Sequence, residues 1–212
     1  MLYLSLLSLR TSHLFSLGIL IEGKQVNKEF DAQRMAEKLR NCGNSEDEIL
    51  NCAVRLYSAT SFLFTLLNEA LRNEDISKTD TLGPITWLLN SHIAQNGSIR
   101  DEEFLVYRGA TLNEEMIGEY IEVVGKEIVW RAFTSTSKSR PIAEIFSGNV
   151  LFIIKIQESS FQRRRDISSI SIFPDEEEIL LTANYVFEVE KIQQKETKDG
   201  RKYLIYMTGC GF

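Results

Sequence analysis

The hydrophobic periodicity of this chain of 212 residues changes character near residue 103. Before that point, apolar residues recur at the three- and four-residue spacing of amphipathic helices. After it, short apolar runs of strand length are separated by turn residues. Helical patterns that precede a series of strand patterns are typical of an α+β fold, and the strands are expected to form a mostly antiparallel assembly.

The helical half is expected to contain three main helices. A first helix covers residues 30–39. Ser45 and Glu48 then form a capping-box pattern, which opens one long helix that continues to about Asn73. A third helix covers about 84–95 and stops at Asn96-Gly97, because this pair punctuates helical patterns.

The second half is expected to contain strands joined by short helices. The expected strands cover 104–107, 127–133, 150–156, 179–181, 185–192 and 203–207, with a hairpin turn at Asp199-Gly200 before the last. Short helices begin near Asn113 and near Ser139 and Pro141. The run 163–165 of three arginines is interpreted as a solvated loop.

Composition excludes several classes of protein. The net charge of −6 argues against a nucleic-acid-binding protein, which normally presents a basic face. Cys42, Cys52 and Cys210 lack metal-ligand spacing, so no metal site is expected; they are either free thiols or one pair with one left over. No apolar run of transmembrane length is free of polar residues.

The N-terminal segment 1–24 is apolar and ambiguous. Its basic residue, Arg10, interrupts the apolar run instead of preceding it, and no clear small-residue cleavage site follows. A strand or helix packed on the domain is therefore favoured over a signal peptide. The expected organisation is this segment followed by a single domain over 25–212, with helices in 25–98 and the sheet-rich part in 99–212. A soluble protein is expected, with the cytoplasm slightly favoured over secretion.

Three polar features at the ends of predicted strands carry the candidate chemistry. Arg108 ends the strand 104–107, and its planar guanidinium suits bidentate contact with a phosphate. The hydroxyl run 135–137 follows a second strand. Glu176 and Glu178 precede a third, and strand alternation would place them on one face. Each feature alone has an ordinary structural explanation; together, in this order, they indicate a catalytic site.

The ordered set resembles the arginine-serine-glutamate class of mono-ADP-ribosyltransferases, which includes vertebrate ecto-enzymes and clostridial binary toxins. The matching pieces are Val106-Tyr107-Arg108-Gly109, Phe133-Thr134-Ser135-Thr136-Ser137, Phe173-Pro174-Asp175-Glu176-Glu177-Glu178-Ile179-Leu180 and the helix 62–72. The resemblance covers roughly 47–193. It implies two perpendicular sheets that form a cleft for NAD, which is consumed as a substrate, so no cofactor is expected.

The resemblance also implies roles for individual residues in NAD binding. Arg108 would hold the phosphates, and the Gly109 backbone would meet the nicotinamide amide. Ser135 would bond the ribose or orient Glu178, which would stabilise the oxocarbenium-like transition state. Thr136 would support the strand end. The remaining two, Phe146 and Asn68, would stack on nicotinamide and face NAD or the acceptor, respectively.

The acceptor is implied by residues close to the catalytic glutamate. A glutamate two residues before it goes with arginine acceptors in this family, and here that residue is Glu176. Phe173 takes the place of an aromatic that contacts the target protein. Phe64 stands where many relatives have tyrosine, and Asn149 where some toxins have an arginine for the phosphates. A target protein with an exposed arginine is therefore the expected partner; the alternatives are an NAD glycohydrolase and a non-catalytic binding module.

Overall fold

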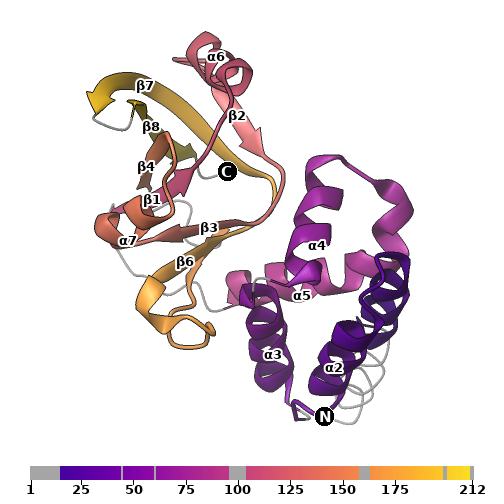
Figure 1. Cartoon of the computed structure of the whole chain (residues 1–212). Helices are drawn as coiled ribbons and strands as arrows, with labels where there is room; N and C mark the ends of the chain where they lie inside the picture. The colour runs from indigo at the N-terminus through magenta and orange to yellow at the C-terminus, as the bar shows by residue number, and fades with distance from the viewer. Residues whose placement is uncertain are drawn as a thin grey trace. The chain divides into compact units, whose positions relative to one another are not determined.

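The computed structural model describes residues 15–43, 45–59, 61–95, 104–157, 163–197 and 200–210. The chain divides into two compact units (Figure 1). The helical unit comprises the described residues up to 95 together with 170–173. The sheet unit comprises the remaining described residues. The expected features at 1–14, at Asn96-Gly97 and at Asp199 lie outside the described residues.

The described part of the helical unit contains a helix over 15–25, four further helices and one 3₁₀ turn. These are α2 (Glu29–Arg40), α3 (Glu46–Ser58), α4 (Phe62–Arg72), η1 (Ile76–Lys78) and α5 (Thr79–Gln95). The predicted capping box is confirmed, because the Ser45 side chain accepts from the Glu48 backbone and the Glu48 side chain accepts in return. Helix α5 begins at Thr79, before the expected start, and carries Pro84 inside it.

The single long helix expected from Ser45 to Asn73 is wrong, because α3 and α4 are two helices bent by 89°. Ser61, which precedes α4, has an extended backbone, and the Ser58 hydroxyl oxygen accepts from the backbone N–H of Ile172. The Ser58 hydroxyl donates to the carbonyl of Arg55 at 3.4 Å, and serine hydroxyls compete with helical hydrogen bonds in this way. No single described helix is long and apolar enough to span a membrane, although α3 and α4 together pass that test by length and composition.

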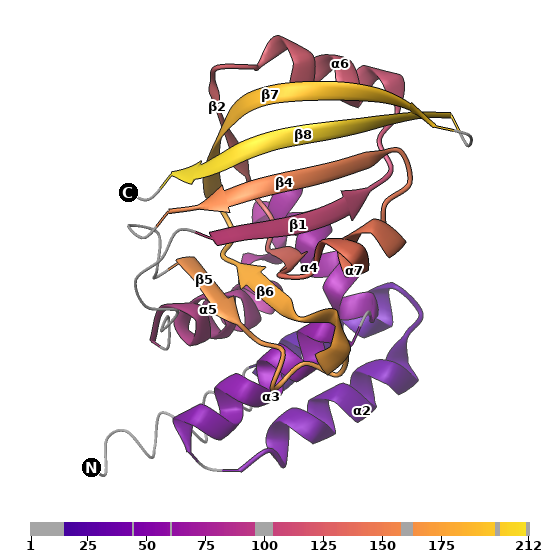
Figure 2. The same ribbon diagram turned by 90° about the vertical axis from the view of Figure 1, so that its left-hand side faces the viewer.

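The sheet unit is built on one eight-stranded sheet in the order β2-β7-β8-β4-β1-β3-β6-β5 (Figure 2). The strands are β1 (Phe104–Ala110), β2 (Glu127–Trp130), β3 (Thr134–Ser137), β4 (Val150–Ile156), β5 (Arg164–Asp166), β6 (Glu178–Leu181), β7 (Tyr185–Thr197) and β8 (Gly200–Cys210). All pairs are antiparallel except β4 with β8. The α+β class is therefore confirmed, with a mixed sheet.

The two expected sheets are two parts of this one sheet, and these parts meet at a narrow join. Pairing between β1 and β3 is recorded only for Tyr107 with Ser137. On one side of that join lie five strands, and on the other lie β3, β6 and β5. Of these, β6 and β5 run obliquely to the long strands in Figure 2. Backbone pairing thus joins what sequence reasoning had separated.

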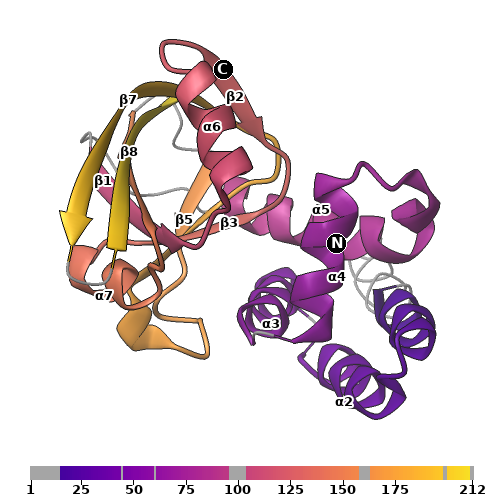
Figure 3. The same ribbon diagram turned by 45° about the horizontal axis from the view of Figure 1, so that its top comes forward.

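Two short helices accompany the sheet (Figure 3). Helix α6 (Glu114–Glu122) begins at Asn113, whose side chain accepts from the backbone N–H of Met116. Helix α7 (Arg140–Ile145) follows Ser139 and has a proline in its first turn, where a missing N–H costs nothing. Both expected helices are therefore confirmed.

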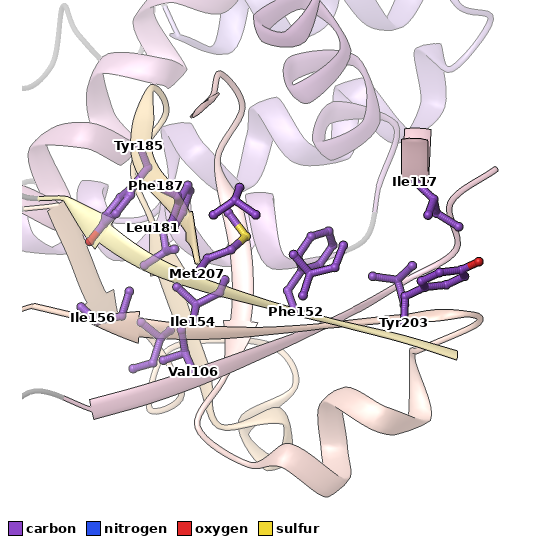
Figure 4. Packing of buried hydrophobic residues seen from close by; sticks show 14 residues of the cluster. Val106, Ile117, Phe152, Ile154, Ile156, Leu181, Tyr185, Phe187, Tyr203 and Met207 are labelled. Carbon is purple, nitrogen blue, oxygen red and sulfur yellow. The ribbon is translucent and has the colours of Figure 1, made fainter. Parts of the chain in front are cut away.

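The larger core cluster of the sheet unit lies on one face of the strands and is rich in aromatic rings (Figure 4). A smaller cluster contains Leu151, Ile153 and Leu204. Trp130 packs edge-on against Phe152, with ring centroids 5.0 Å apart, and lies 4.6 Å from Phe187. The Trp130 indole N–H donates to the Tyr120 hydroxyl at 2.9 Å, so the polar end of each ring is satisfied.

The interpretation of residues 163–165 as a solvated loop is wrong for Arg164, which is 1% exposed in β5. Its guanidinium lies 4.7 Å from the centroid of the Phe104 ring and donates to the carbonyl of Gln157 at 2.7 Å. A buried arginine needs such partners to offset the loss of water. The side chain therefore has a structural role.

Candidate active site

Arg108 lies inside β1, not at its end as expected, because β1 continues to Ala110. Its Nη1 donates to the carbonyl of Ser135 at 2.7 Å. The guanidinium therefore bridges β1 and β3 just beyond Tyr107 and Ser137, the residue pair at which these strands are joined. Arg108 also lies near Tyr120. Burial raises the pKa of the Tyr120 hydroxyl, while the hydrogen bond from Trp130 and the charge of Arg108 oppose that rise.

The hydroxyl run forms a strand of its own, β3, instead of following a strand. Its antiparallel partner is β6, with Ser135 opposite Leu180 and Ser137 opposite Glu178. The Thr136 hydroxyl donates to the carbonyl of Ile179 at 2.7 Å, and the Ser137 hydroxyl donates to the carbonyl of Glu176 at 2.7 Å. The run therefore holds the acidic segment directly.

The two candidate glutamates have different backbone settings. Glu178 is the first residue of β6 and is 4% exposed. Glu176 ends the 3₁₀ turn η3 (Pro174–Glu176), and Glu177 has a left-handed backbone with φ of 48°. Strand alternation therefore does not relate Glu176 to Glu178, which corrects that part of the sequence argument. Burial raises the pKa of the half-buried Glu176 carboxyl.

Gly109 allows the end of α7 to lie against β1. A Cβ added at Gly109 would lie 2.3 Å from the carbonyl oxygen of Ala143 and 2.4 Å from the nitrogen of Ser147. These atoms are backbone and have no room to move aside, so only glycine fits. Phe146, the C-cap of α7, is 59% exposed beside this contact.

Asn149 has a structural role where some toxins carry arginine. Its side-chain oxygen accepts from the Leu112 backbone N–H at 2.9 Å, and its nitrogen donates to the Leu112 carbonyl at 2.8 Å. This pair of bonds fixes the turn between β1 and α6 to the start of β4. The amide is thus engaged with the backbone of its own unit.

The other three candidates lie on the helical unit. Asn68 is buried on α4 and donates to the Tyr57 hydroxyl at 2.9 Å, while its side-chain oxygen has no partner among the described residues. Phe64 is half-buried one turn earlier, with its ring centroid 5.0 Å from that of Tyr57. Phe173 is 42% exposed, and its backbone N–H donates to Ser171.

Within the sheet unit, the structure brings together Arg108, Ser135, Thr136, Glu176 and Glu178 across three neighbouring strands and one turn. A guanidinium can bind a phosphate group. A buried carboxylate can stabilise a positive charge that develops in a transition state. Across the described ranges, no group of His, Cys, Asp and Glu side chains is placed to hold a metal ion.

This combination of fold and site defines an ADP-ribosyltransferase architecture, and comparison with known proteins identifies the family. Residues 25–204 match the model of the NAD:arginine ADP-ribosyltransferase family. The chain therefore belongs to this family. Over 89 residues it is 38% identical to Mav of Mycobacterium avium (strain 104), which is named as a candidate NAD(+)–arginine ADP-ribosyltransferase. That match spans 41% of this chain and only 10% of Mav, so the chain corresponds to a small part of that relative.

Solved structures support the same fold. The ADP-ribosyltransferase HopU1 of Pseudomonas syringae pv. tomato is 22% identical with a TM-score of 0.65, covering 88% of this chain and 85% of HopU1. The toxin Plx2a of Paenibacillus larvae is 18% identical with a TM-score of 0.62, covering 89% and 96%. Exoenzyme S of Pseudomonas aeruginosa, solved with carba-NAD and human 14-3-3 protein beta, is 18% identical with a TM-score of 0.61, covering 93% and 88%. At these identities the likeness concerns the fold alone.

Sequence reasoning assigned no role to Ser137, whose hydroxyl donates to the backbone carbonyl of Glu176. The serine was visible within the hydroxyl run, but a run of three hydroxyls does not reveal which one meets which carbonyl. The strand register does, because it places Ser137 opposite Glu178. The only available signal was that Ser137 ends the run.

Proposed function

We propose that this chain cleaves the bond between nicotinamide and ribose in NAD and transfers ADP-ribose to an arginine of a target protein. The observation that carries the proposal is the bond from Arg108 to Ser135 on β3, the strand whose other end pairs with Glu178. Arginine, serine and glutamate come from three different strands to one region, in the order typical of the family.

Each residue takes a role that its chemistry supports. Arg108 holds the NAD phosphates, and Ser135 bonds the nicotinamide ribose or orients Glu178. The Glu178 carboxylate binds the ribose 2′-hydroxyl and stabilises the positive charge that develops as nicotinamide leaves. Its burial strengthens that interaction, because little water is present there to screen the charge. NAD is a substrate, and the reaction needs no further cofactor or metal ion.

The supporting contacts complete the NAD site. The Gly109 backbone meets the nicotinamide amide, and the exposed Phe146 ring stacks on nicotinamide. Thr136 supports the strand through its bond to the carbonyl of Ile179. For Asn68, which belongs to the helical unit, we keep the role in NAD binding that the resemblance implies.

Glu176 pairs with the guanidinium of the acceptor arginine. A protonated guanidinium is a poor nucleophile, so a nearby carboxylate must pair with it and draw off a proton. Burial raises the pKa of Glu176, which makes its carboxylate a better base. Phe173 and Phe64 contact the target protein. Without an acceptor, water would take the ADP-ribose, as in an NAD glycohydrolase.

The test measures nicotinamide release and labelling of agmatine, a small guanidine, from the same NAD. Glu178→Gln keeps the shape of the side chain but removes its charge. We expect nicotinamide release to fall about 100- to 1,000-fold, as for loss of one preorganised transition-state contact. NAD binding should weaken far less, because the full cation exists only in the transition state. Equal losses in binding and turnover would contradict this role for Glu178.

A further inference from the structure

Two hydroxyls of β3 hold the backbone on either side of Glu178. Thr136 donates to the carbonyl of Ile179, which follows Glu178 in β6. Ser137 donates to the carbonyl of Glu176, which precedes Glu178 by two residues in η3. The two bonds have the same length, 2.7 Å, but they fix different parts of the acidic segment.

The Ser137 hydroxyl both donates and accepts a hydrogen bond. A serine hydroxyl has one hydrogen to donate, and here it goes to Glu176, while the oxygen accepts from the Ser139 backbone N–H at 3.0 Å. Ser139 is the N-cap of α7. One 6%-exposed side chain therefore joins the last residue of η3 to the start of α7.

Glu178 is held without the Ser137 side chain. Its backbone pairs with β3 in the ladder, and its carbonyl accepts from the Ile167 N–H at 3.0 Å. The backbone of Glu177 is likewise tied by its own carbonyl, which accepts from the Lys138 N–H at 3.1 Å. Glu176 differs, because its hydrogen bond to β3 comes from the Ser137 side chain, which a substitution removes without breaking the ladder.

We propose that Ser137 is a positioning residue that aims Glu176 at the acceptor and thereby sets how ADP-ribose is divided between arginine and water. This inference rests on the proposed arginine transfer. Loss of the Ser137 hydroxyl frees the last residue of η3, so the Glu176 carboxylate samples orientations that do not meet the guanidinium. Glu178 stays in its ladder, so cleavage of NAD continues and water takes more of the product.

The experiment compares Ser137→Ala with wild type in nicotinamide release and agmatine labelling measured on the same samples. We expect agmatine labelling to fall about tenfold, the scale of one lost hydrogen bond. Nicotinamide release should stay within about threefold, and the KM for agmatine should rise more than the KM for NAD. Ser137→Thr retains a hydroxyl and should restore much of the labelling.

Two further variants make the outcome specific. Ser139 lies two residues after Ser137, and its hydroxyl makes no capping bond. Ser139→Ala should therefore leave the ratio of labelling to release unchanged. Ser137→Cys keeps the approximate size of the side chain but has a weaker donor. It serves as the second test of the hydrogen bond if the alanine variant does not fold.

Three results would overturn the inference. Equal loss of labelling and release in a folded Ser137→Ala protein would place Ser137 in the NAD site. An unchanged ratio of labelling to release in both Ser137→Ala and Ser137→Cys would show that the hydrogen bond is dispensable. A wild type that releases nicotinamide but labels no guanidine would remove the proposed arginine acceptor, and this inference with it, whereas the first two results leave that acceptor standing.

Discussion

The guanidinium of Arg108 donates a 2.7 Å hydrogen bond to the carbonyl of Ser135, just past the point where β1 and β3 are recorded to pair. This bond continues the connection between the two strand groups where the ladder stops. A side chain proposed to bind the NAD phosphates therefore also fixes the distance between two strands of the site. Substitution at Arg108 should affect both properties.

Arg108→Lys should lower kcat/KM for NAD cleavage by about 100-fold and also lower the melting temperature. Lysine keeps the charge, but its single nitrogen lacks the fork that serves two partners in fixed geometry. Steady-state kinetics and thermal unfolding check both effects. Arg140→Lys, which alters an exposed ion pair with Glu144, is the matched control and should change neither. A normal KM for NAD in Arg108→Lys would argue against phosphate binding.

Glu176→Gln should abolish agmatine labelling while nicotinamide release stays within about tenfold, because water needs no carboxylate to act as the acceptor. The share of product transferred to agmatine should also depend on pH in wild type. Burial raises the pKa of Glu176, so its carboxylate becomes protonated at a higher pH than an ordinary glutamate. Transfer relative to hydrolysis should therefore decline as pH falls through that raised pKa, and should show no such decline in the glutamine variant. If both activities fall together in Glu176→Gln, the residue belongs to NAD cleavage.

Glu177→Gly should raise the free energy of unfolding by about 0.5–1 kcal/mol. Glu177 has a left-handed φ of 48°, which costs a residue with a Cβ on the order of 1 kcal/mol and costs glycine little. Part of the gain is lost to the greater freedom of glycine in the unfolded chain. Denaturant midpoints measure the change. Glu177→Gln retains the strain and should be neutral, whereas Glu177→Val should destabilise the protein.

The thiols of Cys42 and Cys52 should react slowly with iodoacetamide at neutral pH. Burial raises the pKa of both thiols, that of Cys52 to about 12. The sulfur of Cys42 lies 2.9 Å from the carbonyl of Leu39, and that of Cys52 lies 3.7 Å from the carbonyl of Lys38. The thiolate is the reactive form, so the alkylation rate of Cys52 should still be rising above pH 10. Mass spectrometry of modified peptides resolves each cysteine, and rapid labelling of Cys52 at pH 7 would contradict the burial of its sulfur.

Local patterns in the sequence predicted what local interactions decide. The capping box at Ser45 and Glu48 formed as expected, since its partners lie three residues apart. The break between α3 and α4 was not visible, because apolar spacing stays helical from Ile49 to Leu71 on both sides of the bend. The role of Arg164 was also hidden, because its burial depends on Phe104 and on the carbonyl of Gln157.

The candidate site was predicted in its residue types but not in its contacts. The order of Arg108, Ser135 and Glu178 along the chain was enough to indicate the family. Their geometry depends on register, which pairs Ser137 with Glu178 and leaves Arg108 to reach Ser135 through its side chain. A left-handed glutamate at 177 breaks the strand alternation on which the relation of Glu176 to Glu178 was first argued.

The position of β8 between β7 and β4 has a consequence for how the protein is made. β4 is almost wholly apolar and pairs with β8 in parallel, yet residues 157–199 must be synthesised between the two strands. Such long-range pairing forms slowly, and chains grow from the N-terminus on the ribosome. Until β8 emerges, β4 has an open edge that is able to pair with a neighbouring chain. The risk of misassembly during translation is therefore greatest after β4 has emerged and before β8 has emerged. A chaperone bound during that interval would protect the nascent protein most.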